Sequence, residues 1–142
     1  MTGESSTVSD AKLISLESHC TEVGDLVVGS QGTGIGFVPK RVYYLYDIPA
    51  ASERGGHAHK ELQQVIVALS GSFEVELNDG WSQSTVTLNQ PTKGLSLPPG
   101  LWRELKEFSG GAICLVLASS EYDEDDYIRD EEEFLNWKQG KQ

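Results

Sequence analysis

The hydrophobic and polar residues of this chain fall into short alternating runs that turn residues separate. The clearest runs lie in residues 63–88, QQVIVALSGSFEVELNDGWSQSTVTL, where two runs flank Ser70-Gly71 and a third follows Asp79-Gly80. An Asp-Gly pair between alternating runs is a strong signal of a tight β-hairpin. We therefore predict three consecutive antiparallel strands over this segment.

Further strand patterns lie on both sides of this segment. Residues 41–48, RVYYLYDI, are rich in aromatic and β-branched side chains and end at Pro49. Residues 111–118, GAICLVLA, form a continuous apolar run that suits a central strand. Weaker patterns occupy residues 12–18, 25–30, 34–38 and both sides of the Pro-Pro-Gly turn in 94–108. So many short strands predict an all-β sandwich or barrel.

The two ends of the chain lack the strand pattern of the central residues. Residues 1–11 are polar, and we expect them to be disordered ahead of a single domain over residues 12–142. Only residues 126–139, DYIRDEEEFLNWKQ, favour a helix, because acidic residues fill the first turns of a 3.6-residue apolar pattern. The predicted architecture is an all-β domain with a short C-terminal helix.

Composition narrows the class of protein. The formal charge of −11 argues against nucleic-acid binding, which requires a basic surface. No apolar run approaches the ~20 residues of a membrane span, and the N-terminus lacks a signal peptide's pattern. We predict a soluble, cytoplasmic protein in which Cys20 and Cys114 remain free thiols. Many of the acidic residues lie in residues 121–133, so the net charge says little about the interior of a site. An anionic substrate could still bind in a pocket where arginines converge.

A histidine pair is the main candidate for chemistry. In RGGHAHKELQQ, residues 54–64, His57 and His59 flank Ala58, so in an extended backbone both rings point to the same face. Gln64 and Gly71 follow, and a second turn leads to Arg103. This pattern resembles the two cupin motifs, G-x5-H-x-H-x3,4-E-x6-G and G-x5-P-x-G-x2-H. The resemblance implies a cupin fold, a small jelly-roll barrel.

The departures from the cupin motifs argue against a metal site. Gln64 occupies the position of the acidic ligand, and Arg103 occupies that of the third histidine. An arginine keeps its proton and repels a divalent cation, and two neutral imidazoles are too few for a zinc site. We expect no metal and no other cofactor, and we predict that His57 and His59 are acid–base groups.

A longer match points to a narrower family. RVYYLYDIPAASERGGHAHKELQQ, GLSLPPGLWRELKEFS and LVLASSEYDEDDYIRDEEEF resemble the dTDP-4-keto-6-deoxyglucose 3,4-ketoisomerases, cupin-fold enzymes of deoxysugar biosynthesis. The resemblance covers residues 40–137. The chain departs from the family at Val23-Gly24, where an Arg-Gly pair is common, and at Arg103, where histidine is frequent. The resemblance implies a dTDP-linked 4-keto-6-deoxy sugar as substrate.

Such a reaction takes a proton from C3 and returns one at C4 through an enediol. Histidine suits a base that works near neutral pH, and no redox cofactor is needed. From the resemblance we expect His59 to be the principal base at carbon and His57 its partner at oxygen. The candidate substrate-binding residues are Arg41, Arg54 and Arg103 for the pyrophosphate, with Tyr43 and Gln64 for the sugar.

Other functions stay open at this point. A sugar-nucleotide 3,5-epimerase is also a cupin, but it would use a buried Asp to orient its histidine, and we find no obvious Asp near the pair. A cupin that binds a sugar nucleotide without catalysis is a second alternative, and a metal cupin is disfavoured by Gln64 and Arg103. We expect Trp102 to pack the barrel, Tyr127 and the acidic helix to lie at the surface or a dimer contact, and two copies to form a homodimer through exchanged edge strands.

Overall fold

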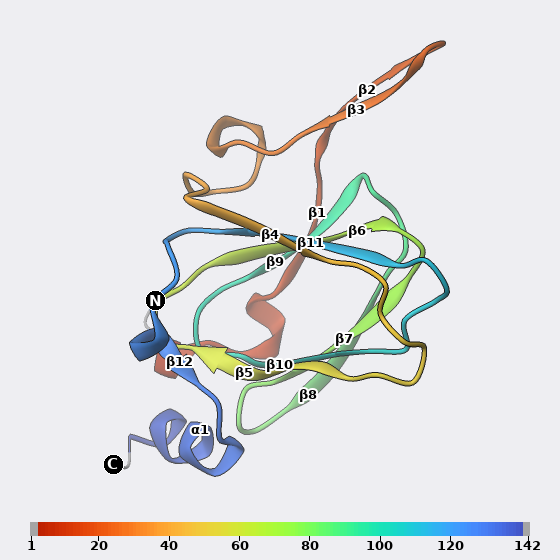
Figure 1. Ribbon diagram of the computed structural model, residues 1–142. Coiled ribbons are helices and arrows are strands. Elements are labelled where there is room, and N and C mark those ends of the chain that lie inside the picture. Colours follow the sequence, from red (N-terminus) through yellow and green to blue (C-terminus); the bar gives the residue numbers. More distant parts are fainter. Residues whose placement is uncertain (1–2, 141–142) are drawn as a thin grey trace.

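A computed structural model describes residues 3–140. Two antiparallel sheets, each of five strands, face each other, and a separate two-stranded hairpin extends away from them (Figure 1). The first sheet has the order β1-β9-β6-β11-β4, the second has the order β12-β5-β10-β7-β8, and the hairpin is β2-β3. This arrangement confirms the predicted all-β barrel with a short C-terminal helix.

The strands are β1 (Lys12–Ser15), β2 (Glu17–Thr21), β3 (Gly24–Val28), β4 (Arg41–Leu45), β5 (Arg54–His59), β6 (Gln64–Ser70), β7 (Phe73–Asn78), β8 (Gln83–Leu88), β9 (Lys93–Leu97), β10 (Trp102–Lys106), β11 (Ile113–Ala118) and β12 (Tyr127–Ile128). Four 3-10 helices and one α-helix complete the described chain: η1 (Gly3–Ser5), η2 (Val8–Asp10), η3 (Gln31–Thr33), η4 (Glu124–Asp126) and α1 (Glu131–Lys138).

The hydrophobic core lies between the two sheets. β7 alternates strictly, so Phe73, Val75 and Leu77 are buried against residues from the facing sheet, including Ile66 and Val116. β6 is buried on both faces, because Val65 and Val67 on its outer face pack with Leu16, Ile35 and Phe37. A strand buried on both sides explains why VIVAL reads as a continuous apolar run. The apolar core fills one part of the barrel and leaves the other for polar side chains.

The N-terminal segment differs from the prediction. Residues 3–5 and 8–10 form 3-10 helices packed against the domain, and residues 1–2 lie outside the described residues. The backbone N–H of Val8 donates to Asp79 at 2.8 Å, and the buried ammonium of Lys138 donates to the carbonyls of Gly3 and Ser6 at 3.0 and 2.6 Å. Polar composition suggested disorder, but these long-range bonds hold the backbone in place.

The C-terminal helix is shorter than predicted. It begins at Glu131, where the Asp130 side chain accepts from the N–H of Glu133 at 3.0 Å. The preceding residues form β12, in which Tyr127 pairs with His59 and Ile128 pairs with Ala58 on β5. Strand pairing and burial of Ile128 outweigh the helical periodicity here. As a consequence, Tyr127 points into the barrel instead of lying on a helix surface.

Three smaller expectations can be checked against the structure. Trp102 packs in a small cluster with Ala58, Ile128 and Phe134, as predicted. Cys20 is exposed, Cys114 is buried, and both are free thiols. No helix among residues 3–140 is long and apolar enough to span a membrane.

Candidate active site

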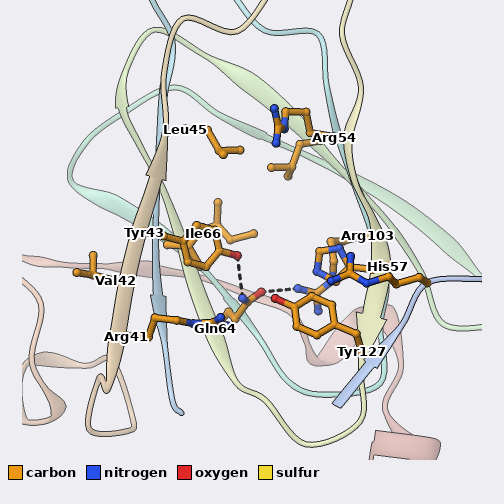
Figure 2. Close-up of a pocket in the computed structure, with 13 residues that line it drawn as sticks. Arg41, Val42, Tyr43, Leu45, Arg54, His57, Gln64, Ile66, Arg103 and Tyr127 are labelled. Atoms are coloured by element: carbon orange, nitrogen blue, oxygen red, sulfur yellow. Dashed lines mark hydrogen bonds between the residues drawn. The ribbon is translucent and has the colours of Figure 1, made fainter. Parts of the chain in front are cut away.

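A cavity of about 420 Å³ opens between the two sheets (Figure 2). Strands β4, β6 and β11 form one wall, and β5, β10 and β12 form the other. The lining residues are Arg41, Val42, Tyr43, Leu45, Arg54, His57, Gln64, Ile66, Arg103, Leu105, Val116, Tyr127 and Arg129. Every sequence-predicted site residue except His59 lines this cavity. Tyr127 and Arg129 line it as well, although sequence reasoning assigned neither to the site.

The two histidines lie side by side on β5. Their Nε2 atoms are 3.2 Å apart, and the rings meet edge to face at a centroid distance of 4.8 Å. Strand alternation therefore places both rings on one face, as predicted. They differ in access, because His57 lines the cavity whereas His59 has no exposed surface. A substrate in the cavity would contact His57 directly and His59 only through it.

An aspartate missed by sequence reasoning stands behind the pair. The Nδ1 atom of His59 lies 3.0 Å from Oδ2 of Asp126. The same carboxylate accepts the backbone N–H groups of Glu61 at 2.7 Å and Leu62 at 3.3 Å. No Asp near the pair was obvious from the sequence, because Asp126 is 67 residues away from His59 and reaches it only when β12 joins β5. Its position inside an acidic run gave no signal of this role.

The environment keeps His59 neutral. Burial lowers the pKa of His59 far below its ordinary value, and the positive charges of Arg103 and other cationic groups lower it further. Burial raises the pKa of Asp126, while the two backbone N–H donors oppose that rise. At neutral pH the pair therefore consists of an uncharged imidazole beside a hydrogen-bonded carboxylate.

A second polar chain crosses the cavity from β10 to β4. Arg103, which is 2% exposed, donates from Nε to the carbonyl of Leu101 at 3.1 Å and from Nη1 to Oε1 of Gln64. Gln64 in turn donates from Nε2 to the hydroxyl oxygen of Tyr43 at 3.1 Å, and Figure 2 shows Gln64 between its two partners. Because the Tyr43 oxygen accepts from Gln64, its own proton is directed elsewhere, toward the cavity.

Arg103 is only partly satisfied by the protein. Its Nη2 atom is buried and has no hydrogen-bond partner among the described residues. Burial lowers the pKa of Arg103 to about 10, so the guanidinium still carries its charge at neutral pH. A buried, charged donor without a partner is costly, and a ligand oxygen in the cavity would satisfy it.

Three more arginines make the cavity electropositive in an acidic protein. Arg41 lies over the ring of Tyr43 at 5.3 Å, and its Nε atom is buried without a partner among the described residues. Arg129 lies over the ring of Tyr127 at 4.2 Å and is held by Glu124 through hydrogen bonds of 2.7 and 2.8 Å. With Arg54 and Arg103, these groups form an arginine cluster that suits a phosphate-bearing ligand.

The donor set does not fit a divalent metal. Among residues 3–140, no three His, Cys, Asp or Glu side chains gather as potential ligands. Asp126 takes up one nitrogen of His59, and the remaining cupin ligand positions hold Gln64 and Arg103. A guanidinium aimed at the same cavity opposes a second positive charge there.

Comparison with known proteins places this geometry in a family. Residues 9–139 match the family model described as "FdtA: WxcM-like, C-terminal". A TDP-4-oxo-6-deoxy-α-D-glucose-3,4-oxoisomerase from Aneurinibacillus thermoaerophilus is 42% identical over 126 residues, which cover 89% of this chain and 91% of that protein.

Two solved structures share the fold closely. A 3,4-ketoisomerase from Helicobacter canadensis is 42% identical with a TM-score of 0.88, covering 92% of this chain and 98% of that one. The sugar 3,4-ketoisomerase QdtA from Thermoanaerobacterium thermosaccharolyticum, solved in complex with TDP, is 34% identical with a TM-score of 0.90, covering 94% and 98%. Fold and sequence agree, and the chain belongs to the FdtA-like family of sugar 3,4-ketoisomerases.

Proposed function

We propose that this protein converts dTDP-4-keto-6-deoxyglucose to its 3-keto isomer by metal-independent acid–base catalysis. One observation carries the proposal: His57 faces an arginine-lined cavity while a neutral His59 contacts it from behind. Membership of the 3,4-ketoisomerase family and the named activity of the 42% identical relative support the same substrate.

The arginine cluster would bind the diphosphate of the substrate. Arg41 and Arg103 each keep a buried nitrogen that no described residue satisfies, and Arg54 lies at the more exposed end of the cavity wall. Arginine forks match phosphate oxygens bidentately, so these groups can hold the nucleotide while the sugar reaches His57. QdtA, solved with TDP, shows that a relative of this fold accepts the nucleotide.

Two hydrogen-bonded series of side chains supply the chemistry. One is Asp126–His59–His57, and the other is Arg103–Gln64–Tyr43. His57 removes the proton from C3 while Tyr43 gives a proton to the C4 carbonyl oxygen, which produces the enediol. Protonated His57 exchanges its proton with solvent and then delivers one to C4, and the C3 hydroxyl returns its proton to Tyr43 as the carbonyl forms at C3. Protons and electrons balance over the cycle, so no co-reactant is consumed.

The assignment of the base reverses the order expected from the resemblance. His59 has no exposed surface and lies behind His57, so it cannot contact the sugar carbon directly. We therefore assign proton transfer at carbon to His57, with His59 as its hydrogen-bond partner. Gln64, fixed by Arg103, keeps the Tyr43 proton turned toward the sugar oxygens.

Proton NMR of the reaction in D2O with EDTA tests the function. We expect the wild type to turn dTDP-4-keto-6-deoxyglucose into a 3-keto sugar with deuterium at C4, and we expect His57→Asn to lose this conversion. Deuterium at C3 or C5 without carbonyl migration would instead identify an epimerase. Tight binding without exchange would identify a non-catalytic binding protein.

We further propose a homodimer. The β2-β3 hairpin extends from the barrel and exposes Val23 and Leu26, and the outer face of the edge strand β4 exposes Val42 and Tyr44. An isolated two-stranded hairpin is marginally stable, so a second copy that pairs with it would bury these apolar side chains. Sedimentation should give twice 15.5 kDa, and a single-chain mass at micromolar concentration would contradict the dimer. We also propose a cytoplasmic location, which the free thiols of Cys20 and Cys114 support.

A further inference from the structure

The carboxylate of Asp126 is held in a fixed orientation. Its Oδ1 accepts the N–H of Glu61 at 2.7 Å, and its Oδ2 accepts the N–H of Leu62 at 3.3 Å. Asp126 also accepts the N–H of Lys60 with its own backbone carbonyl at 3.0 Å, so both side chain and backbone are tied to the turn after β5. The turn that follows the histidine pair therefore orients the aspartate that contacts it.

This orientation determines where the protons of the pair lie. A carboxylate whose two oxygens already accept backbone N–H groups is an acceptor, so Nδ1 of His59 carries the proton of the 3.0 Å bond. The Nε2 atom of neutral His59 is then a lone pair that faces Nε2 of His57 at 3.2 Å. Two lone pairs at that distance would repel, so the proton between the rings belongs to His57.

We propose that Asp126 is a positioning residue: it fixes the Nδ1–H tautomer of His59 and thereby makes His59 a hydrogen-bond acceptor for protonated His57 during the transfer between C3 and C4. This role rests on the proposed isomerase function. Asp126 does not line the reaction cavity and acts only through His59. His59 and Asp126 both line a second cavity of about 240 Å³, which shares Arg41 and Tyr127 with the reaction cavity.

Several other charged groups surround the pair and bear on any pH dependence. Arg41 and Tyr43 approach from β4, Arg103 approaches from β10, and Tyr127 stacks at 4.3 Å from the ring of His59. Arg129 lines the cavity and is paired with Glu124, whose charge also acts on His57. The arginines lower the pKa of His59, and the carboxylate of Asp126 contacts its ring and opposes them.

Nitrogen-15 NMR of the wild-type protein, with histidines labelled, tests the tautomer without any mutation. We expect His59 to show a protonated Nδ1 and an unprotonated Nε2 near neutral pH. An Nε2–H tautomer, or a doubly protonated His59, would overturn the proposal. This measurement needs no substrate, so it stands apart from whether the protein is an isomerase.

Asp126→Asn tests the consequence for turnover. The amide would present an N–H to His59 and reverse the tautomer, and the same exchange behind the histidine of a serine protease lowers kcat by ~10⁴-fold. We expect kcat to fall by ~10²–10⁴-fold with KM changed less than about threefold, and the tautomer of His59 to switch. Loss of the negative charge should also move the acidic limb of the kcat/KM profile to lower pH.

Asp125→Asn is the matched control. It makes the same change of charge one residue away, on an exposed side chain outside both polar chains, and it should leave kcat and the tautomer unchanged. An Asp126→Asn enzyme with near-wild-type kcat would overturn the positioning role. If wild-type enzyme made no 3-keto sugar at all, the proposed function would fail, while the NMR result would still decide the tautomer.

Discussion

Arg103 and Lys138 are both cations buried within the same small domain, yet the protein satisfies them differently. The ammonium of Lys138 donates to the carbonyls of Gly3, Ser6 and Gly100 at 3.0, 2.6 and 2.9 Å, which uses all three of its N–H groups. Arg103 donates to Leu101 and Gln64 but leaves Nη2 without a partner among the described residues.

We infer from this difference that Lys138 stabilises the fold and that Arg103 binds the substrate. Lys138 joins the N-terminal segment, the Pro-Pro-Gly turn and helix α1, and it does not line the reaction cavity. Arg103 faces the reaction cavity and carries unused hydrogen-bonding capacity at a cost to stability. A buried polar group that remains unsatisfied at the wall of a cavity indicates where a ligand will bind.

Of the two buried cations, Arg103 should have the larger effect on function when it is replaced. We expect Arg103→Met to lower kcat/KM by ~10–10²-fold, because a charge-assisted hydrogen bond to a phosphate oxygen is worth about 1.5–3 kcal/mol. Stability should change little, because loss of a partly unpaired buried charge offsets the lost bond to Gln64. Steady-state kinetics and urea unfolding measure the two effects. Full activity with a large loss of stability would show that Arg103 is structural.

Replacing Lys138 should give the opposite result. Lys138→Met leaves three carbonyls without their donor, and we expect the free energy of unfolding to fall by about 3 kcal/mol. The folded fraction should retain kcat within about twofold. Lys12→Met, at an exposed position, is the control and should change neither quantity. An unchanged free energy of unfolding for Lys138→Met would contradict the claim that Lys138 stabilises the fold.

His59 is a third buried group that can carry a positive charge, but unlike Arg103 and Lys138 it is neutral in the folded protein. Its folded-state pKa lies below its ordinary value of about 6.5, so below that pH the unfolded chain binds a proton that the folded protein does not. Stability therefore falls as pH drops below 6.5, by up to ~1.4 kcal/mol per pH unit from this group. Urea unfolding at pH 7.5, 6.5 and 5.5 measures the slope.

His59→Gln and His19→Gln separate the sources of that slope. His59→Gln should make the slope shallower, whereas His19→Gln should leave it unchanged, since His19 is exposed on the hairpin. Equal slopes in the wild type and His59→Gln would mean that His59 takes up a proton in the folded protein.

The local parts of this architecture could be predicted from sequence. The hairpins at Gly71 and Gly80 adopt the positive φ angles that their turns require, and strand alternation placed His57 and His59 on one face. Each of these features depends on residues a few positions apart, so periodicity and turn chemistry are enough to identify it.

The parts that sequence reasoning missed depend on long-range pairing. Asp126 and Tyr127 join the site only because β12 pairs with β5, and the acidic run that contains them favours a helix on local grounds. The N-terminal segment is ordered through bonds to Asp79 and Lys138, which lie far along the chain. No local sequence pattern indicates such long-range contacts. Sequence alone therefore could not predict that Asp126 orients His59 or that His57, and not His59, faces the cavity.

A crystal structure of His57→Asn with dTDP-4-keto-6-deoxyglucose tests the central claim most directly. We predict that C3 of the sugar lies within ~3.5 Å of the residue 57 side chain, a near-attack distance, and that Nη2 of Arg103 donates to a substrate oxygen. A complex in which the sugar carbons lie closer to His59 than to residue 57, with Nη2 still unpaired, would contradict both the choice of base and the reading of Arg103.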